Sequence, residues 1–448
     1  MKFSKFGRTV LAAALGTAMT FSLSSCIYSF TVGYLYVTGT QTATPAGSGI
    51  ISAYGIDNDT GKLIELHGFP MGSGGANPGR SVLVDGSRFV YVLNQGTPAN
   101  GSLPCNANNP CSNSNVTEFV VGGNGILTQQ ETFFTQGSNP FRLLSDASGN
   151  YLFALDHDAP SNQFCSAALT GAKTCGDITV FKIDNVTGRL TLVENAQLTA
   201  STGQQVTYFP VPANPVDFAI TSGYVMTVSG ATGVAGGQVA YPYTYNSTNG
   251  QLVVSQNVPQ VLNSGSGAPM EAATAIIFSG AKVYVLDNEP LTATANGVTL
   301  TSPAQIVPFT IGTNGALQSL TGGAVLDDPT ETSPIYLITD AKNRFVYVAN
   351  QFGASQATGS GITGYTIDPA SALLTETPGS PWGTGSNPQC LVEDSSDQYI
   401  YTANANDSTI TGRVLDPNSG SLNPMNGSTG VFGLAGPAAW CWIDGRTN

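Results

Sequence analysis

Short stretches of alternating or continuous apolar residues recur along the whole chain. One type is an aromatic and aliphatic run of four to six residues, predicted here as strand B, because β-branched and aromatic residues favour strands. It occurs seven times, beginning at Tyr34, Phe89, Tyr151, Tyr224, Val283, Phe345 and Tyr399. An alternating strand C follows each copy. It is clearest at 51–63, 178–190 and 362–373 and weaker from Val116, Val239, Ile306 and Ile410.

Two further elements complete each repeat. Strand C ends in a D-x-x-T-G-x-L segment, as at Asp57–Leu63, which predicts a glycine-containing turn into strand D, with a calcium loop as the weaker alternative. A Pro-led apolar run, strand A, precedes strand B. Its prolines are Pro78, Pro140, Pro215, Pro269, Pro334, Pro388 and Pro437.

The order of the copies at the two chain ends predicts a closed ring. The last strand A, at 438–444, has no strand B after it, and the first strand B, at Tyr34, has no Pro-led strand A before it. The C-terminal strand should therefore join the N-terminal blade. Closure of this kind removes open sheet edges. The sequence predicts an all-β fold, a seven-bladed β-propeller with four-stranded blades.

Composition supports one large domain. The 448 residues include 53 Gly and 26 Pro, only 10% are charged, and no break in composition divides the chain. We expect a single propeller over residues 34–448. Neither a nucleophile elbow, a phosphate loop, an HExxH helix nor a nucleotide fingerprint occurs in the sequence, which argues against those enzyme classes.

The first residues form a predicted export signal. Lys2, Lys5 and Arg8 precede an apolar segment at 10–21, and Leu23-Ser24-Ser25-Cys26 matches a bacterial lipobox. We expect a lipoprotein signal peptide at 1–25, a lipidated Cys26 and a short tether at 26–33. The alternative is an ordinary signal peptide with a chance cysteine. The predicted location is the cell envelope, on the periplasmic side or the cell surface, with the outer membrane favoured because Ile27 is not an acidic retention signal.

Charge narrows the range of partners. Loss of the three basic leader residues would take the formal net charge from −13 to −16. Such a surface repels nucleic acids and anionic lipids, so membrane attachment would depend on the lipid alone. The expected partner of this monomer is a small molecule or an envelope protein.

Six cysteines remain after Cys26, an even number that fits an oxidising compartment. Cys105 and Cys111 share one loop, as do Cys165 and Cys175, so local disulfides are the simplest pairing. Elimination then pairs Cys390 with Cys441. No CxxC pair occurs, and His67 and His157 are the only histidines, so neither a metal nor another cofactor is expected.

The long loops fall on one predicted face. Insertions follow strand B at 95–113, 157–175, 289–304 and 351–359. Because adjacent strands are antiparallel, the B-to-C and D-to-A connections share a face of the disc, here called the decorated face. Loops of this kind carry function more often than the scaffold does, although random drift in loop length is the alternative. The short tether enters from the opposite face, so the decorated face should point away from the membrane.

The strand B and strand C motifs together resemble the lactonase-type seven-bladed propellers, the family of bacterial 6-phosphogluconolactonase and carboxymuconate cyclase, and the related YVTN repeats. The resemblance covers nearly the whole mature chain and implies the propeller fold and a lactonase activity. That family commonly carries a G-P-R-H segment and a strand ending in Asn-Glu. Here Gly267–Glu271 lacks the Arg and His, whereas Asn288 and Glu289 are kept.

A ring of side chains is predicted at the mouth of the central channel on the decorated face. Its members stand two places after each strand-A proline: Arg80, Arg142, Asp217, Glu271, Tyr336, Cys390 and Ala439. Two guanidinium groups and two carboxylates could bind a carboxylate- or hydroxyl-bearing ligand. We therefore predict ligand binding by Arg80, Arg142, Asp217, Glu271 and Tyr336.

Other readings of the ring remain open. In a sugar-lactone hydrolase, His157 or Glu289 would be the candidate general base and an arginine would stabilise the oxyanion. Alternatively, the charges only pair across the mouth and bind water. Trp440 and Trp442 are expected to brace the closing blade.

Overall fold

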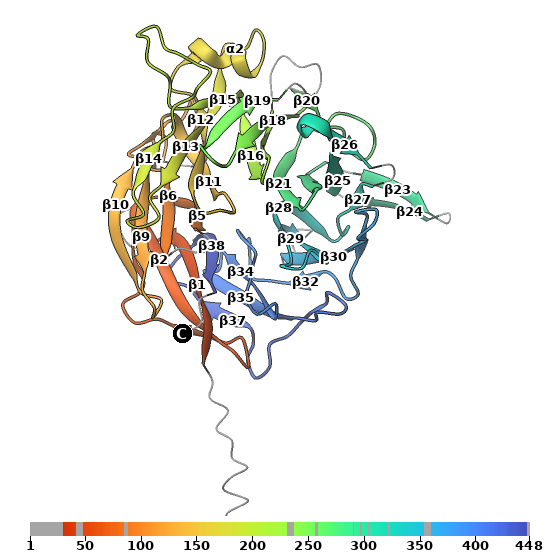
Figure 1. Ribbon diagram of the computed structural model, residues 1–448. Helices are drawn as coiled ribbons and strands as arrows, with labels where there is room; N and C mark the ends of the chain where they lie inside the picture. Colours follow the sequence, from red (N-terminus) through yellow and green to blue (C-terminus); the bar gives the residue numbers. More distant parts are fainter. Residues whose placement is uncertain are drawn as a thin grey trace, which may run out of the picture.

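A computed structural model of the chain is a closed ring of β-sheets (Figure 1). The structure describes residues 30–41, 48–84, 88–101, 103–230, 237–255, 259–289, 291–295, 298–302, 304–320, 323–353 and 360–445. The proposed signal peptide and Cys26 lie outside the described residues. Within these ranges, no helix is long and apolar enough to span a membrane.

Seven antiparallel sheets, the predicted blades, follow one another around the ring. From the centre outward, blade 1 contains β38 (Ala438–Asp444), β1 (Thr31–Thr40), β2 (Ser48–Asp57) and β3 (Leu63–Glu65) with β4 (Met71–Ala76). Blade 2 contains β5 (Pro78–Leu83), β6 (Phe89–Asn94), β9 (Asn115–Val121) and β10 (Leu127–Phe133). Blade 3 contains β11 (Ser138–Ser145), β12 (Tyr151–Asp158), β13 (Cys175–Ile183) and β14 (Leu190–Leu192) with β15 (Phe209–Pro212).

Blade 4 contains β16 (Pro215–Ile220), β17 (Tyr224–Ser229), β18 (Val239–Asn246) and β19 (Gln251–Val254) with β20 (Gln260–Val261). Blade 5 contains β21 (Ala273–Ser279), β22 (Lys282–Asp287), β25 (Gln305–Ile311) and β26 (Leu317–Ser319) with β27 (Val325–Leu326). Blade 6 contains β28 (Glu331–Thr339), β29 (Phe345–Gly353), β30 (Gly361–Ile367) and β31 (Leu374–Glu376) with β32 (Trp382–Gly383). Blade 7 contains β33 (Val392–Glu393), β34 (Tyr399–Asn404), β35 (Thr409–Leu415) and β36 (Leu422–Asn423) with β37 (Val431–Gly433).

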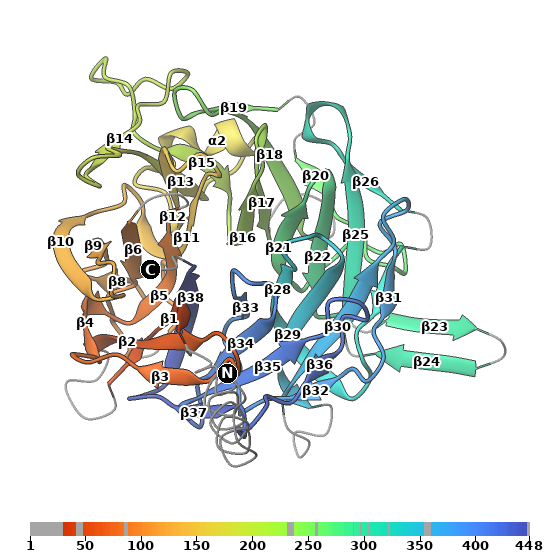
Figure 2. The same ribbon diagram turned by 60° about the horizontal axis from the view of Figure 1, so that its bottom comes forward.

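The predicted four-strand blade is confirmed, with one refinement in its outer strand. In every blade except the second, strand D is broken into two pieces that pair with opposite ends of strand C. The β-strand pairs β7 (Thr97–Pro98) with β8 (Cys111–Ser112) and β23 (Leu291–Ala295) with β24 (Val298–Ser302) lie in the inserted loops. A short 3₁₀ turn (Asn162–Phe164) and α2 (Cys165–Ala168) occupy another insertion, and a second 3₁₀ turn is at Thr313–Gly315. Figure 2 shows β23 and β24 projecting from the rim.

Packing between blades explains the continuous apolar runs of strand B. The hydrophobic core consists of seven clusters, and each joins residues of two neighbouring blades, so a strand B is buried on both faces. The tyrosines of these strands also bridge blades. The Tyr347 hydroxyl donates a hydrogen bond to the carbonyl of Gly420 at 2.8 Å. The Tyr401 hydroxyl donates to the carbonyl of Gly61 at 2.7 Å, which joins blade 7 to blade 1.

The D-x-x-T-G-x-L segments form turns, as predicted. Asp184 Oδ1 accepts hydrogen bonds from the amides of Val186 and Thr187, both at 2.9 Å, which occupies the carboxylate inside its own turn. Gly188 has φ +81°, and a Cβ there would lie 2.2 Å from the side chain of Glu118 in blade 2. Both facts require glycine at this place.

Closure of the ring is confirmed. Residues Tyr34–Thr38 of β1 pair antiparallel with Trp440–Asp444 of β38, so the first and last strands of the described residues share blade 1 (Figure 1). All three predicted disulfides are present: Cys105–Cys111, Cys165–Cys175 and Cys390–Cys441, the last with Cα atoms 5.8 Å apart. Cys390–Cys441 ties blade 7 to blade 1. β1 begins at Thr31, three residues before the strand start expected from the apolar run.

Candidate functional site

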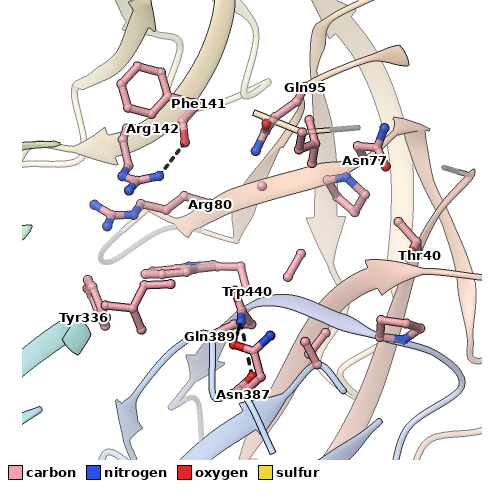
Figure 3. A pocket seen from close by; sticks show the side chains of 18 residues that line it. Thr40, Asn77, Arg80, Gln95, Phe141, Arg142, Tyr336, Asn387, Gln389 and Trp440 are labelled. Atoms are coloured by element: carbon pink, nitrogen blue, oxygen red, sulfur yellow. Dashed lines mark hydrogen bonds between the residues drawn. The ribbon is translucent and has the colours of Figure 1, made fainter. Parts of the chain in front are cut away.

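The inner strands enclose a cavity of about 380 Å³ at the decorated end of the central channel. Its walls come from blades 1, 2, 3, 6 and 7 (Figure 3). Leu103 of the β7–β8 loop also lines it. The lining residues are Thr40, Asn77, Pro78, Gly79, Arg80, Gln95, Leu103, Phe141, Arg142, Ile335, Tyr336, Asn387, Gln389, Ala405, Pro437, Ala438, Ala439 and Trp440.

Two arginines share one buried carboxylate beneath this cavity. Arg80 Nη1 and Arg142 Nε each lie 3.2 Å from Asp217 Oδ1, although the three residues come from blades 2, 3 and 4. Asp217 Oδ2 accepts from the amide of Ile276 at 3.1 Å, so the carboxylate is also bound to blade 5. The side chain of Asp217 is fully buried, whereas Arg80 is 6% and Arg142 27% exposed.

Charge in this group is unbalanced. Arg80, Arg142 and Asp217 together carry a formal excess of one positive charge, and no aspartate or glutamate is among the lining residues. Burial lowers the pKa of Arg142 to about 10, and the charge of Arg80 contributes in the same direction. At neutral pH the guanidinium of Arg142 therefore remains charged, close to that of Arg80. An anion in the cavity would relieve their repulsion.

The two guanidinium groups also have N–H donors without a hydrogen-bond partner in the described part of the chain. A guanidinium has five N–H donors. Arg80 donates to Asp217 from Nη1, and its Nε is buried without a hydrogen-bond partner. Arg142 donates to Asp217 from Nε and to the carbonyl of Phe141 from Nη1 at 3.3 Å (Figure 3). Among the residues that the structure describes, neither Nη2 group makes a hydrogen bond.

Aromatic rings form the wall opposite the arginines. The guanidinium carbon of Arg80 lies 4.6 Å from the ring centre of Trp440 and 5.1 Å from that of Tyr336. The two rings contact each other edge to face, with centres 4.7 Å apart. These contacts hold Arg80 in one orientation through cation–π attraction. Burial raises the pKa of Tyr336, so its hydroxyl stays protonated at neutral pH.

The outer part of the cavity is lined by amide side chains. Asn77 and Gln95 come from blade 2, and Asn387 and Gln389 from blade 7. Gln389 Nε2 donates to Asn387 Oδ1 at 2.7 Å (Figure 3). Amides both donate and accept hydrogen bonds, so this rim is suited to hydroxyl groups.

A bulge in the inner strands decides which side chains reach the centre. In blades 3, 4, 5 and 6, one residue is skipped in the pairing of strand A with strand B, as between Pro140 and Arg142. Blade 1 has the same irregularity, with Ala438 opposite Gly39 and Trp440 opposite Thr38. Bulges re-aim side chains in this way. The ring position of blade 1 is therefore Trp440, one residue beyond the predicted Ala439, which also lines the cavity.

Glu271 was also placed wrongly. The strand-A residue just before the bulge is a proline in blades 2, 3, 4 and 6, but in blade 5 it is Ala273, opposite Asp287. The ring position of that blade is thus the small, buried Ala275, and Glu271 lies on the surface before β21. Pro269 belongs to the preceding loop, where it bridges to Asn263. In the sequence, the pairing of Ala273 with Asp287 could have been found by counting residues backward along the hairpin from Asp287.

The remaining candidates lie around the cavity instead of in it. Cys390 is buried in its disulfide. His157 Nδ1 lies 3.2 Å from Asp158 Oδ2, and the centre of its ring lies 6.3 Å from that of Phe141, which lines the cavity. Glu289 interacts with Asp287, whose pKa burial and the Glu289 charge raise to about 8. Neither His157 nor Glu289 lines the cavity.

Comparison with known proteins agrees with the motif resemblance. A family model described as lactonase, 7-bladed β-propeller, matches residues 291–432. No curated protein matches the sequence closely enough to count as a relative. A candidate 6-phosphogluconolactonase of Bacteroides fragilis has a TM-score of 0.61 at 16% identity, over 92% of this chain and 98% of that one.

Two other solved structures give the same result. A candidate 6-phosphogluconolactonase of Bacteroides uniformis has a TM-score of 0.62 at 14% identity, over 92% of this chain and 100% of that one. The periplasmic gluconolactonase PpgL of Pseudomonas aeruginosa has a TM-score of 0.60 at 16% identity, over 92% and 99%. Identities this low show the fold alone. The chain is thus a lactonase-like seven-bladed β-propeller, and its sequence resemblance to the lactonase family is confirmed over residues 291–432.

Proposed function

We propose that the cavity at the decorated end of the channel binds a small anionic molecule. The supporting observation is that Arg80 and Arg142 share the single carboxylate of Asp217 and keep donors without partners. Charge-assisted hydrogen bonds from guanidinium groups are strong and suit carboxylates and phosphates. Asp217 lies behind the arginines and positions them, so it is not expected to touch the ligand.

The rest of the cavity narrows the ligand class. Amide side chains at the rim offer hydrogen bonds to hydroxyl groups, and the faces of Trp440 and Tyr336 offer an apolar wall. A cavity of about 380 Å³ is at the small end of ligand pockets. A sugar acid, with one anionic group toward the arginines and hydroxyls toward the amides, fits this division.

Hydrolysis of a sugar lactone or related cyclic ester is the second candidate. The lactonase family model and the structural similarity to PpgL, a periplasmic gluconolactonase, favour it. The arginines could stabilise an oxyanion. A general base is harder to find, because the ionisable lining residues are Arg80, Arg142 and Tyr336, and His157 and Glu289 lie outside the cavity. Binding is therefore preferred to catalysis.

We further propose that the protein is exported and lipid-anchored at Cys26. The leader and lipobox pattern and the three disulfides support this location. Mass spectrometry of the protein purified from its native membrane should find a lipid-modified Cys26 as the N-terminus. An unmodified N-terminus elsewhere would refute the anchor.

A ligand screen tests binding and hydrolysis together. Thermal shift and lactone turnover are measured with gluconate, 6-phosphogluconate, galacturonate, glucono-δ-lactone and glucose. Binding predicts stabilisation by the acids and none by glucose. Arg142→Gln should lose this effect, whereas Arg189→Gln, which removes the same charge from an exposed surface pair with Glu131, should keep it. Turnover that survives Arg142→Gln would place any lactonase site elsewhere.

A further inference from the structure

A second polar cluster lies between blades 5 and 6, away from the cavity. Asp327 follows β27, Glu331 begins β28, and both side chains are buried, with 0% and 5% exposure. Each contacts β30 of blade 6. β28 is the innermost strand of blade 6 and β30 is its third, whereas β27 lies in the outer part of blade 5 (Figure 1).

Both carboxylates lie along one face of β30. Asp327 Oδ1 accepts hydrogen bonds from Thr363 Oγ1 at 2.7 Å and from the Tyr365 hydroxyl at 2.8 Å. Glu331 packs against Gly361, where a Cβ would lie 2.4 Å from Glu331 Oε1. Positions 361, 363 and 365 alternate along a strand and so share a face. The two carboxylates are therefore neighbours, and glycine at 361 leaves the space that Glu331 occupies.

Three buried oxygens of this cluster accept no hydrogen bond from the described residues. They are Asp327 Oδ2, Glu331 Oε2 and Asn350 Oδ1. Asn350 belongs to β29, and its amide nitrogen donates to Thr363 Oγ1 at 3.2 Å, which fixes its oxygen as the free end. Buried acceptors are normally satisfied, so three together require an explanation.

The equivalent asparagine in blade 2 has a hydrogen-bond donor for its side-chain oxygen, which Asn350 lacks among the described residues. Asn94 donates to Thr117 Oγ1 at 3.2 Å, as Asn350 does to Thr363, but Asn94 Oδ1 also accepts from Ser73 Oγ at 2.7 Å. Ser73 comes from the outer strand of the preceding blade. In blade 6, that neighbouring outer segment supplies the carboxylate of Asp327 instead of a hydroxyl donor.

No basic side chain compensates the charge. Among the described residues, no lysine or arginine forms an ion pair with Asp327 or Glu331, and Asp328 adds a further negative charge. Burial first, and then the charges of Asp327 and Asp328, raise the pKa of Glu331 to about 8. Glu376 also interacts with Asp327 and Asp328, and its pKa is raised by burial and by these charges.

Another acidic cluster provides the contrast. The carboxylate oxygens of Asp340, Glu393 and Asp397 lie within 4.8 Å of one another. There, Arg344 lies 2.7 Å from both Asp340 and Asp397, and Lys342 pairs with Asp397. That cluster has its own protein cations, whereas the cluster of Asp327 and Glu331 has none among the described residues.

We infer that Asp327, Glu331 and Asn350 form a binding site for a hard divalent cation of the calcium class. Carboxylate and amide oxygens are the ligands that calcium prefers, and calcium accepts irregular coordination geometry. The ion would neutralise the buried carboxylates and occupy all three free acceptors. It would also fasten the segment that links blade 5 to blade 6.

Metal content and thermal stability test this site. The full mature chain is treated with EDTA, dialysed, and measured with and without 1 mM CaCl₂ at pH 7.5. The wild type should retain about one calcium ion per chain by elemental analysis and melt several degrees higher with calcium than in EDTA. Glu331→Gln should lose both effects. Glu393→Gln is the matched control, because burial raises the pKa of Glu393 to about 8 as well, and it should keep both.

Each other outcome overturns the inference. Absence of bound calcium and of a melting shift in the wild type would do so, whatever the variants show. Retention of calcium by Glu331→Gln, or its loss in Glu393→Gln, would place the ion elsewhere. A stability loss between pH 5 and 9 that is equal in EDTA and calcium, and that is present in the wild type but absent in Glu331→Gln, would show that Glu331 holds a proton instead. Circular dichroism in EDTA checks that Glu331→Gln, which only removes a buried charge, is folded.

Discussion

Replacement of Asp217 by Asn tests how the arginine pair is held. In the wild type, one buried carboxylate lies 3.2 Å from a nitrogen of each guanidinium. At an effective dielectric constant of 20, a pair of unit charges about 4 Å apart attracts by about 4 kcal/mol. Desolvation and the repulsion between the arginines offset part of this. Removing one partner of a buried pair typically costs about 3–5 kcal/mol, and we expect Asp217→Asn to lose stability in this range.

The assay is denaturant unfolding of the wild type, Asp217→Asn, Arg80→Met and the double variant. The double variant should recover at least about 1 kcal/mol relative to the sum of the single losses, because contacting charges are coupled. A loss below about 0.5 kcal/mol for Asp217→Asn, the range of ordinary surface changes, would refute the buried charge group. Gluconate should stabilise Asp217→Asn more than the wild type, since the positive excess rises from one to two.

Three further predictions concern other parts of the molecule. Trp440→Leu should weaken binding of an anionic ligand about 5- to 10-fold in calorimetry, because it removes a cation–π contact worth about 1 kcal/mol from Arg80; unchanged affinity would show that the contact is irrelevant. Replacing both Cys390 and Cys441 by alanine should reduce the free energy of unfolding by about 4 kcal/mol, whereas the same change at Cys105 and Cys111 should reduce it by about 2 kcal/mol. The Cys390–Cys441 disulfide contributes more because it closes the longer loop. Equal losses in denaturant titration would contradict this. Burial raises the pKa of Asp156 to about 7, so the folded state holds its proton more tightly than the unfolded chain and stability should fall as the pH rises from about 4 to about 7; Asp156→Asn should flatten that slope in urea titrations at successive pH values.

The fold was predictable because its signals repeat. Each strand B carries its own apolar run, and a strand packed between two blades must be apolar on both faces, which seven copies make unmistakable. The closing strand followed from the order of these copies, and the Cys390–Cys441 pair followed by elimination after the two local disulfides. The broken outer strand D was not predictable, since a piece such as β32 (Trp382–Gly383) is too short to leave a pattern.

The site was only partly predictable, because it depends on register. Arg80, Arg142, Asp217 and Tyr336 meet as expected from their distance to a strand-A proline. The same rule failed at Glu271, and in blade 1 it gave Ala439, which lines the cavity, instead of Trp440. In both blades the proline stands before the residue that precedes the bulge. Trp440 was assigned to packing, and only the bulge opposite Thr38 and Gly39 shows that it contacts Arg80.

Calorimetric titration of the wild-type protein with gluconate and with glucose is the most direct test of the anionic site. We expect gluconate to bind with a stoichiometry near one, added salt to weaken binding, Arg142→Gln to remove it, and Arg189→Gln to preserve it. Glucose should give no heat of binding. Equal binding of glucose and gluconate, or full affinity in Arg142→Gln, would contradict the claim that the paired arginines recognise an anion.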